Sequence, residues 1–258
     1  MAVSLPAALQ PHGNGRVVSG RLALGDGART TVYVAVHPVA TTELRVSVLR
    51  RPRPLVAWCM ARGVQEAIVG GFFVRPDGTP LGELRTRGVA RRHEPFTEPW
   101  DGVRACLHVQ AGTARIARRS ELDAQPRGDL LQAGPLLVRD GAPCFERAAD
   151  AEGFAAASHQ FDSDITDGRH PRAALGLAPG HLVAVACDGR AGDDAGLALE
   201  ELARLLADIG CHTALNLDGG GSTSLISGGR LQNQPRAGVE RPVPGGGAVS
   251  TALVFLPR

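Results

Sequence analysis

LALEELARLLADIGCHTALNLDGGGSTSLI (residues 197–226) combines an amphipathic helix, a buried strand and a glycine-rich turn. Its large apolar side chains recur every three or four residues, at Leu199, Leu202, Leu205, Leu206 and Ile209. This spacing predicts a helix with one buried face, which a left-handed cap at Gly210 would end. The residues HTALNLD (212–218) that follow are mostly apolar up to a carboxylate, so they predict a buried strand.

The turn after this strand presents backbone amides, hydroxyl groups and one carboxylate instead of core side chains. Its sequence DGGGSTS (218–224) lacks the lysine of a P-loop and fits neither the dinucleotide fingerprint nor the G-x-S-x-G nucleophile elbow. Successive glycines let neighbouring N–H groups converge on an anion, and Asp218 would be held beside them as an acid, base or nucleophile. The alternative is a glycine-rich turn that Asp218 merely caps.

The rest of the chain is rich in short strands. Apolar and alternating runs predict strands within residues 16–25, 28–36, 42–50, 64–74, 103–117 and 249–257, and two more within 171–190. Residues 53–63 predict a short helix that Gly63 ends. Because strands outnumber helices and no βαβ unit repeats, we predict an α+β fold: a mixed, strongly twisted β-sheet core with a few flanking helices. We expect a flexible leader over residues 1–15 and a single domain over 16–258.

Composition excludes several classes of function. The chain of 258 residues carries a net charge of +2, too small for the basic field of a nucleic-acid-binding protein. Its 28 basic residues are all Arg, so phosphate recognition falls to guanidinium groups and backbone amides. Five widely spaced cysteines predict free thiols. We find no signal-peptide pattern and no membrane span, and we expect a cytoplasmic protein.

Two other strand ends carry charged residues of the same kind. Asp188, Gly189 and Arg190 follow one apolar strand, and Arg172 begins another in RHPRAALG (169–176). Planar guanidinium groups at these ends could bind a phosphate, although each site alone is more often a turn or a surface charge. Because the strands before Asp188 and Asp218 are both apolar up to the carboxylate, we expect the two carboxylates to face one cleft.

The order of these pieces resembles the phosphodiester glycosidase family, which includes the lysosomal uncovering enzyme and bacterial members. The resemblance covers about residues 52–257 and is carried by AIVGGFF, LLQAGPLLVRDG, PRAALG, VACDGR and NLDGGGS. The positions that match family motifs are Gly70, Gly71, Phe72, Arg172, Asp188, Gly189, Arg190, Asn216, Asp218, Gly219, Gly220, Gly221 and Ser222. Val69 departs from the pattern, because the family has Asn before the glycine pair.

The resemblance implies an α+β fold and hydrolysis of a sugar-1-phosphodiester, with Asp218 and Asp188 as the catalytic carboxylates. It implies that substrate or phosphate is bound by Arg172, Arg190, Asn216, Gly219, Gly220, Gly221, Ser222, Gly70 and Gly71. We expect a small-molecule or glycan phosphodiester as substrate, with no cofactor and no metal ligand among these residues. Two alternatives stay open: a non-catalytic binder of phosphorylated glycans or cell-envelope precursors, and a metal-dependent phosphodiesterase with both aspartates as ligands.

Overall fold

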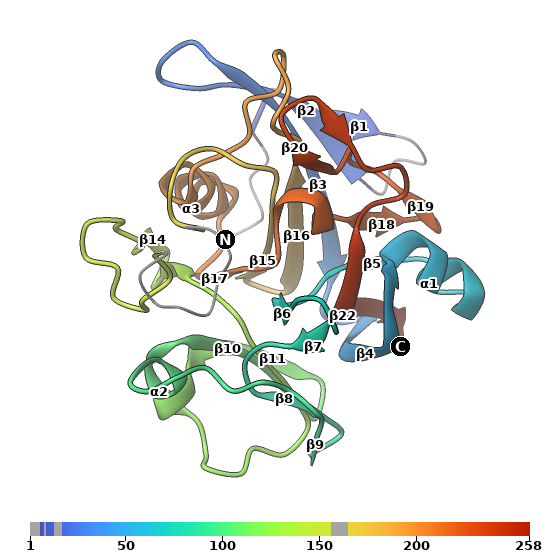
Figure 1. Cartoon of the computed structure of the whole chain (residues 1–258), viewed down its shortest axis with the longest axis vertical. Coiled ribbons are helices and arrows are strands. Elements are labelled where there is room, and N and C mark those ends of the chain that lie inside the picture. Colours follow the sequence, from blue (N-terminus) through green and yellow to red (C-terminus); the bar gives the residue numbers. More distant parts are fainter. Residues whose placement is uncertain (1–5, 8, 13–16, 156–164) are drawn as a thin grey trace.

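The largest sheet of the protein is antiparallel and carries the apolar runs of the sequence at its centre (Figure 1). The computed structural model describes residues 6, 7, 9–12, 17–155 and 165–258. In spatial order the eight strands are β1 (Gln10–His12), β2 (Val17–Ala23), β3 (Arg29–Pro38), β16 (His181–Cys187), β15 (Arg172–Ala178), β17 (Thr213–Asn216), β13 (Leu136–Arg139) and β14 (Ala142–Pro143).

Two five-stranded sheets and two short hairpins form the other sheets of the described residues. One contains β11 (Thr113–Arg118), β10 (Ala105–Gln110), β12 (Asp129–Gln132), β8 (Leu84–Thr86) and β9 (Val89–Ala90). The other contains β19 (Arg230–Leu231), β18 (Leu225–Ser227), β5 (Ala67–Val69), β22 (Ala248–Pro257) and β4 (Thr42–Pro54). The hairpins pair β6 (Phe73–Val74) with β7 (Thr79–Pro80), and β20 (Arg236–Gly238) with β21 (Arg241–Pro242).

Both faces of the large sheet are buried, which explains why β15 and β16 are apolar at nearly every position. Along β3, Val32 and Val34 belong to the core cluster that includes α3 (Leu199–Ile209), whereas Tyr33 and Ala35 belong to the cluster shared with the other two sheets. Successive side chains of a strand point to opposite faces, so a strand covered on both sides needs a continuous apolar run.

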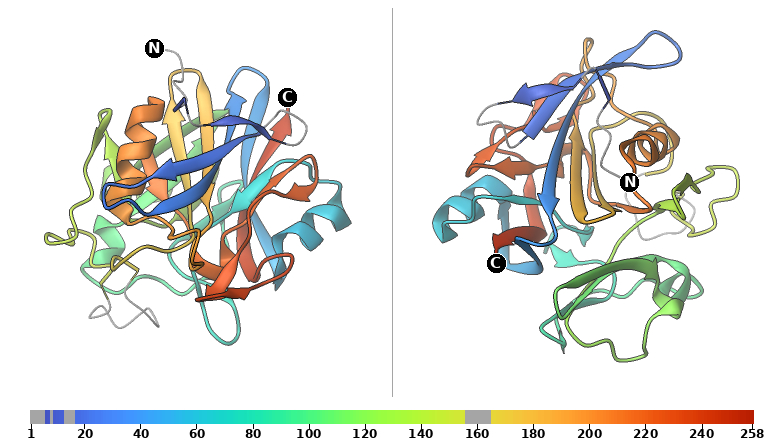
Figure 2. Two further views of the ribbon diagram at one scale, coloured as in Figure 1. Left: turned by 90° about the horizontal axis from the view of Figure 1, so that it is seen from above. Right: turned by 180° about the vertical axis from the view of Figure 1, so that it is seen from behind.

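The helices flank the sheets. The helix α3 covers one face of the large sheet, and α1 (Leu55–Arg62) lies on the opposite side of the molecule (Figure 2). Gly210 and Gly63 adopt the left-handed conformation that ends these two helices. A single turn, α2 (Trp100–Val103), accompanies the sheet of β8 to β12. No helix in the described ranges is long and apolar enough to cross a membrane.

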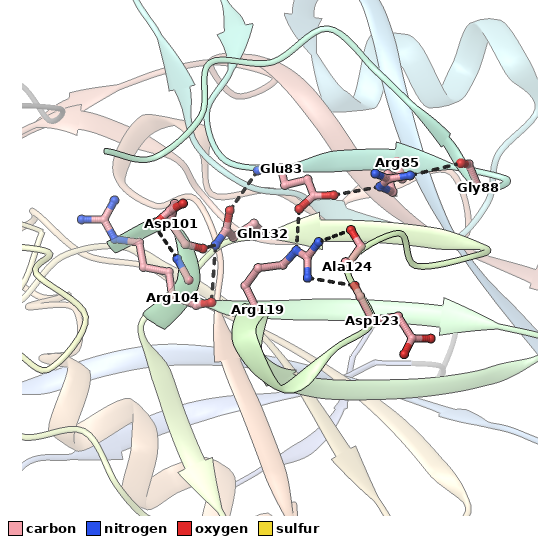
Figure 3. Close-up of polar contacts among 10 residues, drawn as sticks. Glu83, Arg85, Gly88, Asp101, Arg104, Arg119, Asp123, Ala124 and Gln132 are labelled. Carbon is pink, nitrogen blue, oxygen red and sulfur yellow. Dashed lines mark hydrogen bonds and ion pairs between the residues drawn. The ribbon is translucent and has the colours of Figure 1, made fainter. Parts of the chain in front are cut away.

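A polar network connects the β8–β12 sheet to the segments that flank it (Figure 3). The Glu83 carboxylate accepts hydrogen bonds from Arg85 and Arg119, and Arg119 also donates to the carbonyls of Asp123 and Ala124. Gln132 accepts from the Glu83 amide at 3.0 Å. These bonds fix the 119–124 segment over the sheet, and none of these residues lines the cavity described below.

The structure confirms most of the expected elements and corrects three features. The helix at Leu199–Ile209, the hairpin of β15 and β16, and five unpaired cysteines all agree with expectation. The sheets are not mixed, because every described pairing between strands is antiparallel. Part of the expected leader forms a strand, since Gln10–His12 pairs with β2; residues 1–5, 8 and 13–16 lie outside the described ranges. The run 64–74 forms β5 and β6 instead of one strand.

The contact between Gly70 and Thr251 gives a test of this packing. A Cβ atom on Gly70 would lie 2.4 Å from Thr251 Oγ1 and 2.9 Å from its backbone carbon, so β22 would have to move. We expect Gly70→Ala to lower the free energy of unfolding by about 1–3 kcal/mol, as overpacking of a close contact does. Gly25→Ala is the matched control, because no atom lies within 4 Å of a Cβ there. Equal urea midpoints for the two variants would contradict the close approach.

Candidate active site

The register of three central strands brings the charged strand ends together. The strand β15 lies between β16 and β17 and is antiparallel to both, so β16 and β17 run in the same direction. Arg172 pairs with Cys187, and Ala174 pairs with Asn216. The beginning of β15 therefore meets the ends of the other two strands, and Arg172, Asp188 and Asp218 gather at one edge of the sheet.

A cavity of about 690 Å³ opens at this edge. Its polar lining includes Arg75, His170, Arg172, Arg190, Asn216, Asp218 and Ser222, and the glycine turn 219–221 forms part of its floor. Apolar residues of the β6–β7 hairpin, among them Phe73 and Val74, line another part. The volume suits a small ligand, and Asp218 is the single acidic residue among the described residues that line the cavity.

Asp218 carries the carboxylate of this cavity. Its backbone amide donates to the Gly70 carbonyl at 2.9 Å, and its Oδ1 accepts from the Gly219 amide at 2.9 Å. Oδ2 is buried and makes no hydrogen bond to any residue within the described ranges. Burial raises the pKa of Asp218 to about 6, an effect that the nearby Ser222 hydroxyl, the Gly219 amide and the Arg75 charge partly offset. The carboxylate is held in place and is less stable as an anion than in water.

The glycine turn packs closely, and its amides do not form the open nest expected from the sequence. The Gly219 amide donates to Asp218, and the Gly220 amide donates to the Pro171 carbonyl at 2.8 Å. A Cβ atom on Gly219 would lie 2.9 Å from that same carbonyl, and Gly220 has a positive φ of 60°. Of the three amides, only that of Gly221 has no partner among the described residues. The glycines therefore allow close approach between segments, and they orient Asp218.

Arg190 and His170 form a second polar group on the cavity wall. The Arg190 Nη1 atom donates to the carbonyls of Arg236 at 3.2 Å and Ala237 at 2.9 Å, and its Nε lies 3.4 Å from His170 Nδ1. Burial, with the charges of Arg172 and Arg190, lowers the pKa of His170 to about 4. His170 is consequently neutral near pH 7. Because Nδ1 faces a donor, we assign its proton to Nε2.

Arg172 is bound within the protein. Its Nε, Nη1 and Nη2 atoms donate to the carbonyls of Leu197, Ile165 and Gly168 at 3.1, 2.8 and 3.2 Å. The side chain is buried, and the residue lines the cavity. The free guanidinium fork that the sequence suggested is thus already engaged. Arg172 joins β15 to the segments before it and after β16, and it adds positive charge beside the cavity.

Asp188 corrects the expectation that two carboxylates share one cleft. It follows β16 as predicted, but it is 1% exposed and is not among the residues that line the cavity. Its Oδ1 accepts from the Gln234 amide at 2.6 Å, and its Oδ2 accepts from the Tyr33 hydroxyl at 3.0 Å. Burial raises its pKa to about 6, and those two hydrogen bonds partly offset the rise. Asp188 therefore has the environment of a buried anchor.

The other matched residues also separate into two groups. Ser222 lines the cavity, and so does Asn216, whose Nδ2 donates to the Gly134 carbonyl at 2.9 Å. Gly70 and Gly71 do not line it: Gly70 packs against Thr251, and the Gly71 amide donates to Thr251 Oγ1 at 3.0 Å. Both glycines therefore pack against β22, and their contact with substrate stays a prediction. Val69 is fully buried in the core cluster between the sheets and does not line the cavity.

Arg75 is a cavity residue that the sequence did not indicate. It lies between β6 and β7, is exposed, and makes no hydrogen bond or ion pair with another described residue. Its charge nevertheless acts on Asp218. RPDG (75–78) reads as an ordinary turn, and only the folding of the hairpin over the glycine turn places Arg75 at the cavity.

No group of three or more His, Cys, Asp or Glu side chains comes together as a metal site within the described parts of the chain. The cavity contains one carboxylate, one neutral imidazole and three guanidinium groups. This set of groups suits an anionic ligand that carries a reactive centre.

A sequence model of the phosphodiester glycosidase family matches residues 62–250, well over half of the chain. The chain belongs to this family of enzymes. The matched range holds every cavity residue of the glycine turn, both strand ends and the β6–β7 hairpin. The family match thus covers every residue that lines the cavity except Pro52.

The chain is similar to proteins of distant organisms. It is 31% identical over 150 residues to the SPbeta prophage-derived uncharacterized protein YomE of Bacillus subtilis (strain 168); the match covers 56% of this chain and 21% of that protein, so the chain spans about a fifth of its relative. Two solved structures share the fold. The catalytic domain of zebrafish N-acetylglucosamine-1-phosphodiester alpha-N-acetylglucosaminidase, auto-inhibited by its pro-peptide, gives a TM-score of 0.71 at 20% identity, over 97% of this chain and 87% of that one. A hypothetical protein from Synechocystis gives a TM-score of 0.64 at 19% identity. That match covers 94% of this chain and 62% of the other.

The engagement of Arg172 gives a stability test. Arg172→Ala removes three hydrogen bonds to backbone carbonyls, each of which contributes about 1 kcal/mol to stability. We expect a loss of about 3 kcal/mol in the free energy of unfolding, measured by urea denaturation. Arg204→Ala, at an exposed position of α3, is the control and should stay close to wild type. An Arg172→Ala protein as stable as wild type would show that the three bonds contribute little.

Proposed function

We propose that the protein hydrolyses a glycosyl phosphodiester, breaking the bond between the anomeric carbon and the phosphate oxygen, with Asp218 as the reacting carboxylate. The observation that carries this proposal is the partly desolvated Asp218, the single acidic residue among the described residues of a cavity that otherwise presents cations and apolar side chains. Membership of the phosphodiester glycosidase family supports the reaction class.

A single cavity carboxylate fits the chemistry of this bond. Ordinary glycosidases need a second carboxyl group as an acid, because the departing alkoxide is strongly basic. A phosphate monoester is already a good leaving group and needs no protonation at neutral pH. Asp218 is then required for one task, either attack at the anomeric carbon or activation of the water that attacks it. Both roles need the ionised form of the carboxyl group.

The phosphate group is held, in this proposal, by Arg190 and Arg75. Arg190 lies over the glycine turn, since a Cβ atom on Gly220 would be 3.0 Å from its Nη1. Arg75 is exposed and unpaired among the described residues, and its charge reaches Asp218. These groups would neutralise the negative charge that the leaving phosphate gains in the transition state. The electron pair of the broken C–O bond goes to the phosphate oxygen, and water supplies the new hydroxyl of the sugar.

The two alternative functions receive no specific support. A phosphodiesterase that uses both aspartates as metal ligands needs Asp188 in the cavity, and Asp188 is bonded to Tyr33 and Gln234 outside it. A departure from the family pattern at a position that contacts substrate would favour a non-catalytic binder, but Val69, where this chain departs, lies in the core. The products distinguish the reactions: free sugar indicates cleavage at the anomeric carbon, whereas sugar 1-phosphate indicates cleavage on the other side of phosphorus.

Asp218→Asn tests the reacting carboxylate. Asn has nearly the same shape and still accepts a hydrogen bond from the Gly219 amide, but it has no negative charge and takes no proton. We expect kcat/KM for an N-acetylglucosamine-1-phosphodiester, the substrate class in the name of the zebrafish protein, to fall by about 10²–10⁴-fold. The exposed Asp208→Asn on α3 is the matched control. An Asp218→Asn protein that folds and turns over like the control would end the proposal.

The pH dependence gives an independent test. The ionised form of Asp218 is the active one, so activity should be complete above about pH 7 and fall roughly tenfold per unit as the pH drops below the pKa of about 6. His170, with a pKa of about 4, stays neutral through this range. Asp188 also has a raised pKa of about 6, so the profile of kcat/KM should keep its acidic limb in Asp188→Asn, where residue 188 does not titrate. If the acidic limb disappears in Asp188→Asn, the group that must be ionised is Asp188 and not Asp218.

A further inference from the structure

Asp188 connects three distant parts of the chain at the edge of the large sheet. Its carboxylate accepts from the Tyr33 hydroxyl on β3 at 3.0 Å and from the Gln234 amide at 2.6 Å. Its own main chain is bonded to β3 as well, because its carbonyl accepts from Thr30 Oγ1 at 2.9 Å and its amide donates to the Thr31 carbonyl at 2.9 Å. The segment that begins at Gln234 is thereby tied to the centre of the fold.

The segment 234–237 in turn holds the Arg190 side chain. The guanidinium Nη1 of Arg190 donates to the carbonyls of Arg236 and Ala237, at 3.2 and 2.9 Å. The Glu240 amide closes the connection by donating to the Arg190 carbonyl at 2.8 Å. Arg190 itself has a positive φ of 59°, a backbone conformation that the surrounding bonds must maintain in a residue other than glycine. The position of this cation therefore depends on where residues 234–237 lie.

The same segment also forms the cavity wall beside the glycine turn. Ala237 lines the cavity, and a Cβ atom on Gly221 would lie 3.3 Å from the Ala237 Cα atom. A shift of the segment would move Arg190 relative to Asp218, although neither residue touches Asp188 in any described contact. Catalysis depends steeply on such distances, because a displacement of about 1 Å far from the chemistry can cost about 100-fold in rate.

We propose that Asp188 is a positioning residue that acts through segment 234–237 to hold the Arg190 guanidinium in place for the phosphate group. The inference rests on the proposed function only in taking phosphate as the group that Arg190 binds. It changes the role expected from the sequence: Asp188 neither attacks the substrate nor transfers its protons. The side chain of Arg190 is preordered, so less of its conformational freedom is lost when the anion binds.

Substitutions at residue 188 distinguish positioning from acid–base catalysis. Asn retains two hydrogen bonds, because its Oδ1 accepts from the Gln234 amide and its Nδ2 donates to the Tyr33 oxygen. Ala retains neither. We expect Asp188→Ala to lower kcat/KM by about 100-fold and Asp188→Asn to restore most of that loss, while a catalytic carboxylate would lose activity equally in both. Tyr33→Phe removes one of the two bonds and should show a smaller loss of the same kind, even where Asp188→Ala folds poorly.

A double-mutant cycle with Arg190→Ala tests the connection itself. If Asp188 acts through Arg190, the double variant Asp188→Ala/Arg190→Ala should be no worse than Arg190→Ala alone, and Tyr33→Phe should likewise have no effect in the Arg190→Ala background. The same cycle is measured on the dissociation constant of inorganic phosphate, which needs no turnover. Each protein is compared by melting temperature, so that a loss of folding is separated from a loss of position.

The outcomes are distinct. Three results would overturn the positioning role. The first is that the losses caused by Asp188→Ala and Arg190→Ala multiply in the double variant. The others are an equal loss of kcat/KM in Asp188→Asn and Asp188→Ala, and a wild type that does not bind phosphate. Non-additive effects in phosphate binding by a protein without hydrolytic activity would support the positioning role and refute the proposed function. Hydrolysis by the wild type, together with losses that multiply in the double variant, would support the proposed function and refute the positioning role.

Discussion

The site depends on one constraint, the antiparallel placement of β15 between β16 and β17. Two strands that share an antiparallel neighbour run in the same direction, so the residues after β16 and β17 emerge at one edge of the sheet. Burial on both faces keeps this register, because a shift by one residue would exchange every side chain between the α3 face and the face toward the other sheets. The cavity, the glycine turn and the segment 234–237 are all built on this edge.

Asp188 and Asp218 show how one local pattern acquires two roles. Each follows an apolar strand, each is desolvated, and each has a pKa raised to about 6. They differ in their partners. Asp188 receives two hydrogen bonds from other elements, and it is removed from the cavity. The Asp218 carboxylate accepts from the Gly219 amide and lies beside the Ser222 hydroxyl, both within its own turn, and it keeps a place in the cavity wall. A raised pKa therefore does not by itself identify a reacting group.

The three guanidinium groups of the cavity divide in the same way. Arg172 donates from all three guanidinium nitrogens to backbone carbonyls, and Arg190 donates to two carbonyls from Nη1. Arg75 is unpaired among the described residues. A chain with no lysine uses the fork of Arg both to fasten loops and to supply charge to a ligand. This division leaves Arg75 and part of Arg190 as positive charge in the cavity that contains Asp218, where a phosphate would lie in the proposed reaction.

The sequence by itself determined the local elements and the family. The spacing of Leu199, Leu202 and Leu206 specifies a helix, and the apolar runs before Asp188 and Asp218 specify buried strands, because these patterns depend on near neighbours in the chain. Only the tertiary structure decided that the sheets are antiparallel, that Gly70 packs against Thr251, that Asp188 bonds to Tyr33 and Gln234 outside the cavity, and that Arg75 lines the cavity. Each of these depends on a partner far away in sequence, such as Thr251 for Gly70 or Tyr33 for Asp188, and no local pattern encodes which distant atoms will lie within hydrogen-bonding or van der Waals reach.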